Sequence, residues 1–169
     1  MMTDVVGLLK QQMLEADLRF VKKPILIGGM AMEYYGIRKS GADIDLVVCD
    51  EDYQALALKH PDKRKDIWGD LGVVIHPFEI WRCIALLDYD FYAKDAVDEE
   101  SVLIASLERL LLMRVIAMDV PKYMKDLKLI KEYYYKTFRN PAYQEFADSH
   151  MTDYKGLDGI VWSGKYSKE

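Results

Sequence analysis

The sequence predicts one domain of the α+β (mixed α/β) class, in which helices flank a mixed β-sheet. Short apolar runs rich in β-branched residues recur through most of the chain and are typical of strands. Helical patterns separate some of these runs, and two longer helical segments follow the last one. Strands first and paired helices last are the pattern of this class. We expect the domain to span residues 1–139 and a polar tail to follow at 140–169.

Composition limits the kinds of protein that this chain can be. Its 169 residues are 51% hydrophobic and 30% charged, which is typical of a folded domain with one core. The net charge of -5 argues against a protein that coats nucleic acid, although a local basic groove remains compatible. No apolar run approaches the roughly 18 residues of a membrane span. The N-terminus lacks the basic region of a signal peptide, so we expect a cytoplasmic protein without a membrane partner.

The first half of the chain alternates helical and extended patterns. Thr3 or Asp4 can cap a first helix that runs to about Arg19. The carboxylates that begin at Asp50 favour a helix start, because they complement the helix dipole. We expect helices at 4–19, 30–35 and 50–60, strands at 25–27 and 44–49, and a charged, exposed segment at 62–66. Lys63, Arg64 and Lys65 read as a solvated loop, with contact to nucleic acid as the less favoured alternative.

The second half is expected to complete the sheet and then form a helix pair. Its expected elements are strands at 72–76, 78–83 and 102–105, a turn at Pro77, and helices at 106–118 and 121–137. Residues 88–96 show no pattern that assigns them to an element. Arg114 lies in an almost wholly apolar helix and therefore needs a partner, either a buried acid or a bound phosphate.

Residues 24–50 carry the pattern that points to a chemistry. Asp43 and Asp45 are two residues apart on an expected strand, so their carboxylates face the same side. Two carboxylates in one place repel each other unless a cation lies between them, and Mg²⁺ prefers such oxygen ligands. Gly28 and Gly29 end the preceding strand and start a helix, so their backbone N–H groups can approach phosphate oxygens. Beside this turn, the residues available to bind a triphosphate are Arg38, Lys39 and Ser40.

This pattern resembles the nucleotidyltransferase superfamily whose prototype is DNA polymerase β. A strand ending in Gly28-Gly29 is followed by thirteen residues, 30–42, and then by Asp43-Ile44-Asp45. The resemblance implies a nucleotidyltransferase-like mixed sheet with NTP as substrate and two Mg²⁺ ions as cofactors. It also implies that the two glycines hold phosphates and that Asp43 and Asp45 bind the metals. Glu79, on the expected strand at 78–83, is the candidate for the family's third acid, which ligates metal and acts as general base. The alternative is that Glu79 is a solvated or paired strand residue.

The segment 109–130 resembles the C-terminal part of small bacterial nucleotidyltransferases, including abortive-infection toxins. In these proteins a helix with a basic residue is followed by a Lys and an Asp that lead into the last helix. Lys122 and Asp126 match those positions. The resemblance implies that they contact the nucleotide or support the site.

Together these patterns predict an enzyme that moves a nucleoside monophosphate from an NTP to an acceptor hydroxyl. The acceptor, which can be RNA, a protein or a small molecule, is not selected by the sequence, and a protein partner or a homodimer remains open. One alternative is a non-catalytic module of the same fold that binds a nucleotide or, like an antitoxin, a protein partner. A metal-dependent glycosyltransferase is a third reading, disfavoured because it needs a larger sugar-nucleotide domain.

Overall fold

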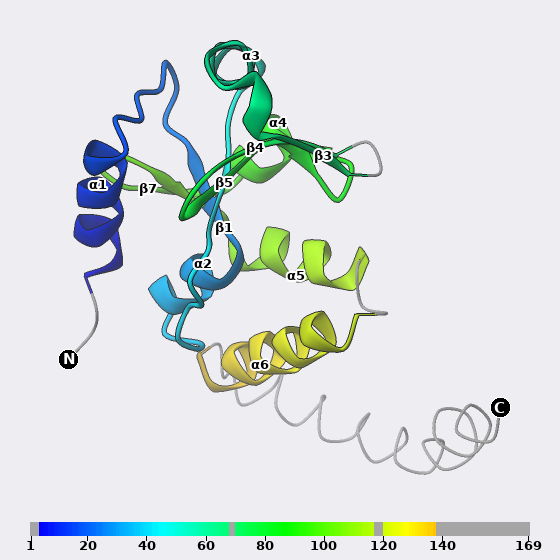
Figure 1. Ribbon diagram of the computed structural model, residues 1–169. Coiled ribbons are helices and arrows are strands. Elements are labelled where there is room, and N and C mark those ends of the chain that lie inside the picture. The colour runs from blue at the N-terminus through cyan, green and yellow to red at the C-terminus, as the bar shows by residue number, and fades with distance from the viewer. Residues whose placement is uncertain (1–3, 68–69, 117–119, 138–169) are drawn as a thin grey trace, which may run out of the picture. The chain divides into compact units, whose positions relative to one another are not determined.

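The computed structural model describes residues 4–67, 70–116 and 120–137 (Figure 1). The chain divides into two compact units, Met1–Ile130 and Lys131–Glu169. The sheet and every residue of the candidate site belong to the first unit, and α6 continues from the first unit into the second. The expected tail at 140–169 lies outside the described residues. None of the helices in the described ranges is long and apolar enough to cross a membrane.

The described residues form six α-helices and eight strands. The helices are α1 (Val5–Glu15), α2 (Gly28–Tyr34), α3 (Asp50–Lys59), α4 (Tyr89–Ala93), α5 (Leu107–Ile116) and α6 (Pro121–Thr137), with a 3₁₀ turn at Pro61–Lys63. The strands are β1 (Ile25–Ile27), β2 (Ile44–Val47), β3 (Arg64–Ile67), β4 (Asp70–Ile75), β5 (Phe78–Ile84), β6 (Leu87–Asp88), β7 (Val97–Asp98) and β8 (Leu103–Ile104).

All eight strands belong to one mixed sheet. Their order is β3-β4-β5-β2-β1-β8-β7, with β6 paired to β5. The pairs β2–β5 and β1–β8 are parallel, whereas β1–β2, β3–β4, β4–β5, β5–β6 and β7–β8 are antiparallel. This mixed sheet with its flanking helices confirms the predicted α+β class.

The core lies on both faces of the central strands. Leu26, Leu46 and Ile80 are fully buried and share one face of the sheet, as their pairing register requires. Ile27 is also buried and points to the opposite face, next to Asp45. Each fully buried aliphatic side chain contributes about 1.5–3 kcal/mol to stability. In Figure 1, α3 lies on one side of the sheet, and α5 and the first part of α6 lie on the other.

Several predicted elements are confirmed, and others begin or end elsewhere. Helix α6 has the predicted bounds, and Ser106 Oγ accepts a hydrogen bond from Arg109 N at 3.3 Å, as expected of the residue that caps α5. Helix α2 begins at Gly28 and not at residue 30. Helix α1 stops at Glu15 and not near residue 19, because Asp17 takes a left-handed conformation and Leu18 N bonds back to Met13 O at 2.9 Å.

The segment 62–66 is mostly exposed, as expected, but the prediction of a solvated loop at Lys63, Arg64 and Lys65 was wrong in part. Arg64–Ile67 forms the edge strand β3, which pairs antiparallel with β4. A short, charged edge strand carries little apolar alternation, so its pairing partner and not its own sequence establishes it. The segment 88–96, which the sequence left unassigned, contains the end of β6 and all of α4.

Candidate functional site

A cavity of about 660 Å³ opens where β1 ends and where β2 and β5 begin. This volume is within the range of about 300–1,000 Å³ that is usual for small-molecule sites. Three carboxylates from β2, from the residue before it and from β5 line it, which we call the acidic cluster: Asp43, Asp45 and Glu79. Asp70 of β4 also lines the cavity, where its carboxylate accepts hydrogen bonds from Ala85 N and Leu86 N. Four cationic side chains from the segment after α2 and from α5 and α6 also line it, which we call the basic cluster: Arg38, Arg114, Lys122 and Lys125.

The two glycines at the start of α2 leave space for charged side chains of the site. Gly28 has a φ of +68°, and a Cβ atom there would lie 2.5 Å from Asp45 Oδ2. A Cβ atom on Gly29 would lie 3.2 Å from Nη1 of Arg38. The Gly-Gly turn therefore lets the Asp45 carboxylate and the Arg38 guanidinium approach the backbone closely. A larger residue at position 28 would displace the carboxylate.

Asp45 and Glu79 are direct neighbours on the same face of the sheet. They face each other across the parallel pair β2–β5, and a hydrogen bond from Ile44 N to Pro77 O at 2.9 Å fixes this register. Burial, and then the charge of Glu79, raises the pKa of Asp45 to about 6. A polar contact from the Trp81 indole N–H and the positive charge of Arg114 both lower the pKa of Asp45 and so oppose this rise. The indole N–H nevertheless makes no hydrogen bond of normal geometry. Asp43 is exposed just before β2 and faces the same cavity.

Glu79 has a positive partner inside the cavity. Lys65 Nζ, from β3, lies 2.8 Å from Glu79 Oε1. This hydrogen bond is the main cause of the raised pKa of Lys65, which burial partly offsets. The same ammonium lies 5.6 Å from the centre of the Trp81 ring, within cation–π distance.

The acidic cluster suits a hard divalent cation only in part. Asp43 and Asp45 offer carboxylate oxygens, and the raised pKa of Asp45 indicates negative charge that a cation would neutralise. Glu79 is already neutralised by Lys65. Consistent with this, the described residues contain no group of three His, Cys, Asp or Glu side chains arranged to hold a metal ion.

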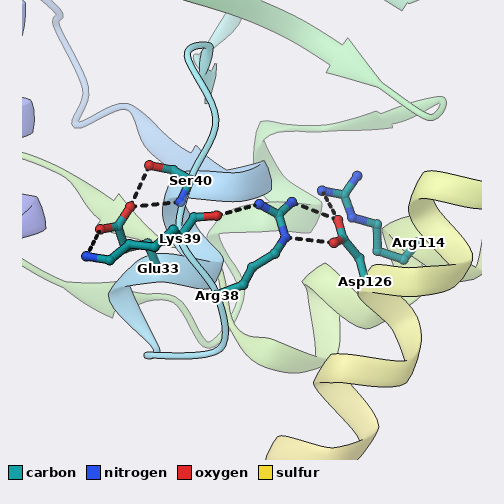
Figure 2. Close-up of polar contacts among 6 residues, drawn as sticks. All are labelled: Glu33, Arg38, Lys39, Ser40, Arg114 and Asp126. Carbon is teal, nitrogen blue, oxygen red and sulfur yellow. Dashed lines mark hydrogen bonds and ion pairs between the residues drawn. The ribbon is translucent and has the colours of Figure 1, made fainter.

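One buried carboxylate holds two arginines of the basic cluster. Asp126 is 3% exposed and accepts hydrogen bonds from Arg38 Nε at 2.7 Å and Arg38 Nη2 at 3.0 Å. Nη2 of Arg114 lies 3.2 Å from Asp126 Oδ2, and Figure 2 shows the carboxylate between the two guanidinium groups. The Arg114 guanidinium also lies 4.5 Å from the ring centre of Tyr123, and burial lowers its pKa. Of the two partners expected for Arg114, the structure therefore contains the buried acid.

The structure brings most of the predicted site residues into this one cavity. Those that line it are Gly28, Gly29, Arg38, Asp43, Asp45, Glu79, Lys122 and Asp126. Lys39 and Ser40 do not line it, because they bind Glu33 instead. Ser40 N lies 2.9 Å and Lys39 Nζ 3.3 Å from Glu33 carboxylate oxygens (Figure 2).

Sequence reasoning missed several residues of the cavity. They include Lys65, Asp70, Trp81, Met113, Tyr123 and Lys125. One signal for Lys65 and Trp81 was present in the sequence, since Gly72 lies inside an expected strand. A glycine in a strand often marks a place where another group approaches the backbone closely. A Cβ atom on Gly72 would lie 2.7 Å from the Trp81 ring.

The arrangement combines groups that bind anions with groups that bind a cation. Arginine and lysine side chains can bind phosphate oxygens, and two carboxylates beside them can hold the cation that accompanies a polyphosphate. Comparisons with protein-family models, with curated proteins and with solved structures gave no match to this chain.

Proposed function

We propose that the protein is a Mg²⁺-dependent nucleotidyltransferase of the DNA polymerase β-like fold. It transfers a nucleoside monophosphate from an NTP to an acceptor hydroxyl. The observation that supports this most directly is that Gly28, the Asp43–Asp45 pair and the basic cluster line one cavity. The mixed sheet agrees with this proposal, because β2, with the two aspartates at its start, pairs with β1, which ends in the glycines.

Each group of the cavity has a role in this proposal. The basic cluster binds the triphosphate, and the glycines keep the backbone free of side chains where it passes the phosphates. Asp43 and Asp45 hold Mg²⁺, which when bound would neutralise phosphate charge and activate the acceptor hydroxyl. Asp126 positions Arg38 and Arg114, because it bonds to both guanidinium groups.

The reaction is an in-line displacement at the α-phosphorus. The acceptor oxygen forms a new bond to that phosphorus, and the bond to the oxygen bridging to the β-phosphate breaks. Pyrophosphate leaves with the bonding electron pair, and the hydroxyl proton passes to a carboxylate of the acidic cluster. The acceptor is a hydroxyl of RNA, of a protein or of a small molecule, and the experiment below separates these classes.

Transfer is tested with purified protein, a panel of four α-labelled NTPs, Mg²⁺ and a cell extract as the source of acceptor. Label is expected in one class of product, which nuclease, protease and filtration distinguish. Asp43→Asn is expected to lower labelling roughly 100-fold, equivalent to about 2.7 kcal/mol in the barrier. Asp98→Asn, at an exposed acid of β7 outside the cavity, is the matched control and keeps full labelling. No labelled product, or equal labelling in Asp43→Asn, contradicts transfer.

A second function is binding of NTP without transfer, as in a regulatory or antitoxin-like module. The pairing of Glu79 with Lys65 favours it, because that carboxylate is then less available as a general base. Calorimetry separates the two functions. A binding module takes up NTP with Mg²⁺ in a manner that depends on Asp43 and Asp45, yet yields no labelled product with any acceptor.

A further inference from the structure

Lys65 reaches the acidic cluster across a gap in the surface of the sheet. Lys65 on β3 pairs with Gly72 on β4, and Gly72 pairs with Trp81 on β5. Glu79 lies two residues before Trp81 on β5, so both point to the face that lines the cavity. Strands lie about 4.8 Å apart, so a lysine two strands away can reach Glu79 diagonally if nothing stands between them.

Gly72 provides that space and Trp81 fills part of it. The Trp81 ring would meet a Cβ atom on Gly72 at 2.7 and 2.8 Å, so the indole lies directly against the glycine. Trp81 is 4% exposed, and the Lys65 ammonium lies over its ring while bonding to Glu79. Three strands thus contribute to the position of one positive charge, which distinguishes Lys65 from a solvated surface lysine.

The charge of the acidic cluster then corresponds to a single divalent cation. The three carboxylates of the acidic cluster and the Lys65 ammonium sum to two negative charges, which belong to Asp43 and Asp45. Asp70, the other sheet carboxylate of the cavity, is not counted with them because its two oxygens accept hydrogen bonds from Ala85 N and Leu86 N. The ammonium donates to Glu79 Oε1 and neutralises that carboxylate. A second metal at Glu79 would have to displace Lys65 or lie close to its positive charge, and both are unfavourable.

We infer that Lys65 replaces one of the two metal ions, so that the site takes one divalent cation, at Asp43 and Asp45, together with its nucleotide. This inference rests on the proposed function and changes its cofactor requirement. Glu79 is then a positioning residue, which acts by holding the lysine in place and does not bind metal. The ammonium supplies the positive charge at the phosphates that the second ion would otherwise provide.

The test is to count metal ions per bound nucleotide. Equilibrium dialysis with Mn²⁺ and a non-hydrolysable ATP analogue, followed by metal and nucleotide analysis, gives both numbers per chain. We expect one Mn²⁺ and one analogue in the wild type, and two Mn²⁺ and one analogue in Lys65→Met, because Glu79 is then free to bind metal. Lys63→Met, at an exposed lysine just before β3, is the matched control and should keep one Mn²⁺.

Glu79→Gln provides the second variant. Since Glu79 is not expected to bind metal in the wild type, this variant should still hold one Mn²⁺ per analogue. Two Mn²⁺ in the wild type that fall to one in Glu79→Gln would overturn the inference but leave nucleotidyl transfer intact. One Mn²⁺ in both the wild type and Lys65→Met would also overturn it. Absence of analogue binding in the wild type would overturn both this inference and the proposed function.

Discussion

Asp45 is a carboxylate whose surroundings oppose its ionisation. Its pKa in the fold is about 6, whereas its ordinary value is 3.8, because of burial and of the neighbouring charge of Glu79. Between these two values the folded chain holds a proton that the unfolded chain has lost. The free energy of unfolding therefore falls as the pH rises from about 4 to about 6, and this contribution is constant above that range.

Asp45→Asn should remove this pH dependence when divalent metals are absent. The variant is expected to be more stable than the wild type at pH 7 by about 1–2 kcal/mol and to lose this advantage near pH 4. Urea unfolding in EDTA, followed by circular dichroism at both pH values, measures the difference. Other carboxylates titrate in both proteins, so a difference that is the same at pH 4 and pH 7 would contradict this description of Asp45.

Gly28 combines a backbone constraint with a contact to the site. Gly28→Ala places a Cβ atom at a φ of +68° and 2.5 Å from Asp45 Oδ2. We expect a loss of about 1–2 kcal/mol in stability and loss of Mg²⁺-dependent NTP binding by calorimetry. Gly36→Ala is the matched control, because Gly36 has a φ of +73° but no atom within 4 Å of the added Cβ. If both variants bind NTP equally, the contact between Gly28 and Asp45 has no role in binding.

Helix α6 holds the site together through one residue near its start. Asp126 bonds to Arg38, which follows α2, and to Arg114 on α5. Both Asp126 and Arg114 are buried, at 3% and 7% exposure. The contribution of such a network to net stability is small, but removing one member leaves buried charge without a partner. The helix pair is therefore coupled by ion pairs to Arg38, whose guanidinium lies beside Gly29 of the Gly-Gly turn.

Asp126→Asn should destabilise the first unit by about 3 kcal/mol or more, since two guanidinium groups lose their counter-charge. Asp98→Asn breaks the exposed Asp98–Lys23 pair of 2.6 Å and should cost about 1 kcal/mol or less. Denaturant unfolding of both variants beside the wild type makes the comparison. If both variants lose the same free energy of unfolding, the burial of Asp126 does not increase its contribution to stability.

At the scale of the whole molecule, the pattern of apolar residues in the sequence predicted the central strands of the sheet well. β1, β2 and β5 lie within or close to their expected ranges because most of their side chains are apolar and buried, and only β1 is buried throughout. β3 and β7 were missed because edge strands depend on a partner and can be short and polar. Helix α2 was expected two residues late, since glycine is a poor predictor of a helix start.

The candidate site was predictable where its residues are close in sequence. Gly28, Asp43 and Asp45 share one short segment, and their spacing alone indicates that they meet. Lys65 could not be assigned in this way, because its approach to Glu79 depends on the register of three strands. The pairing of Asp126 with Arg38 likewise joins residues 88 positions apart, which no local pattern specifies.

Trp81 gives the cavity an optical property. Its indole lies against Gly72 and within cation–π distance of the Lys65 ammonium, and its buried N–H makes no hydrogen bond of normal geometry. Indole fluorescence responds to nearby charge and to hydrogen bonding, so an anion or a cation that enters the cavity changes the emission of this ring. The sequence has only two other tryptophans, Trp68 and Trp162, and replacing both by phenylalanine would make the emission specific to Trp81. The chain thus carries its own reporter of what its cavity binds.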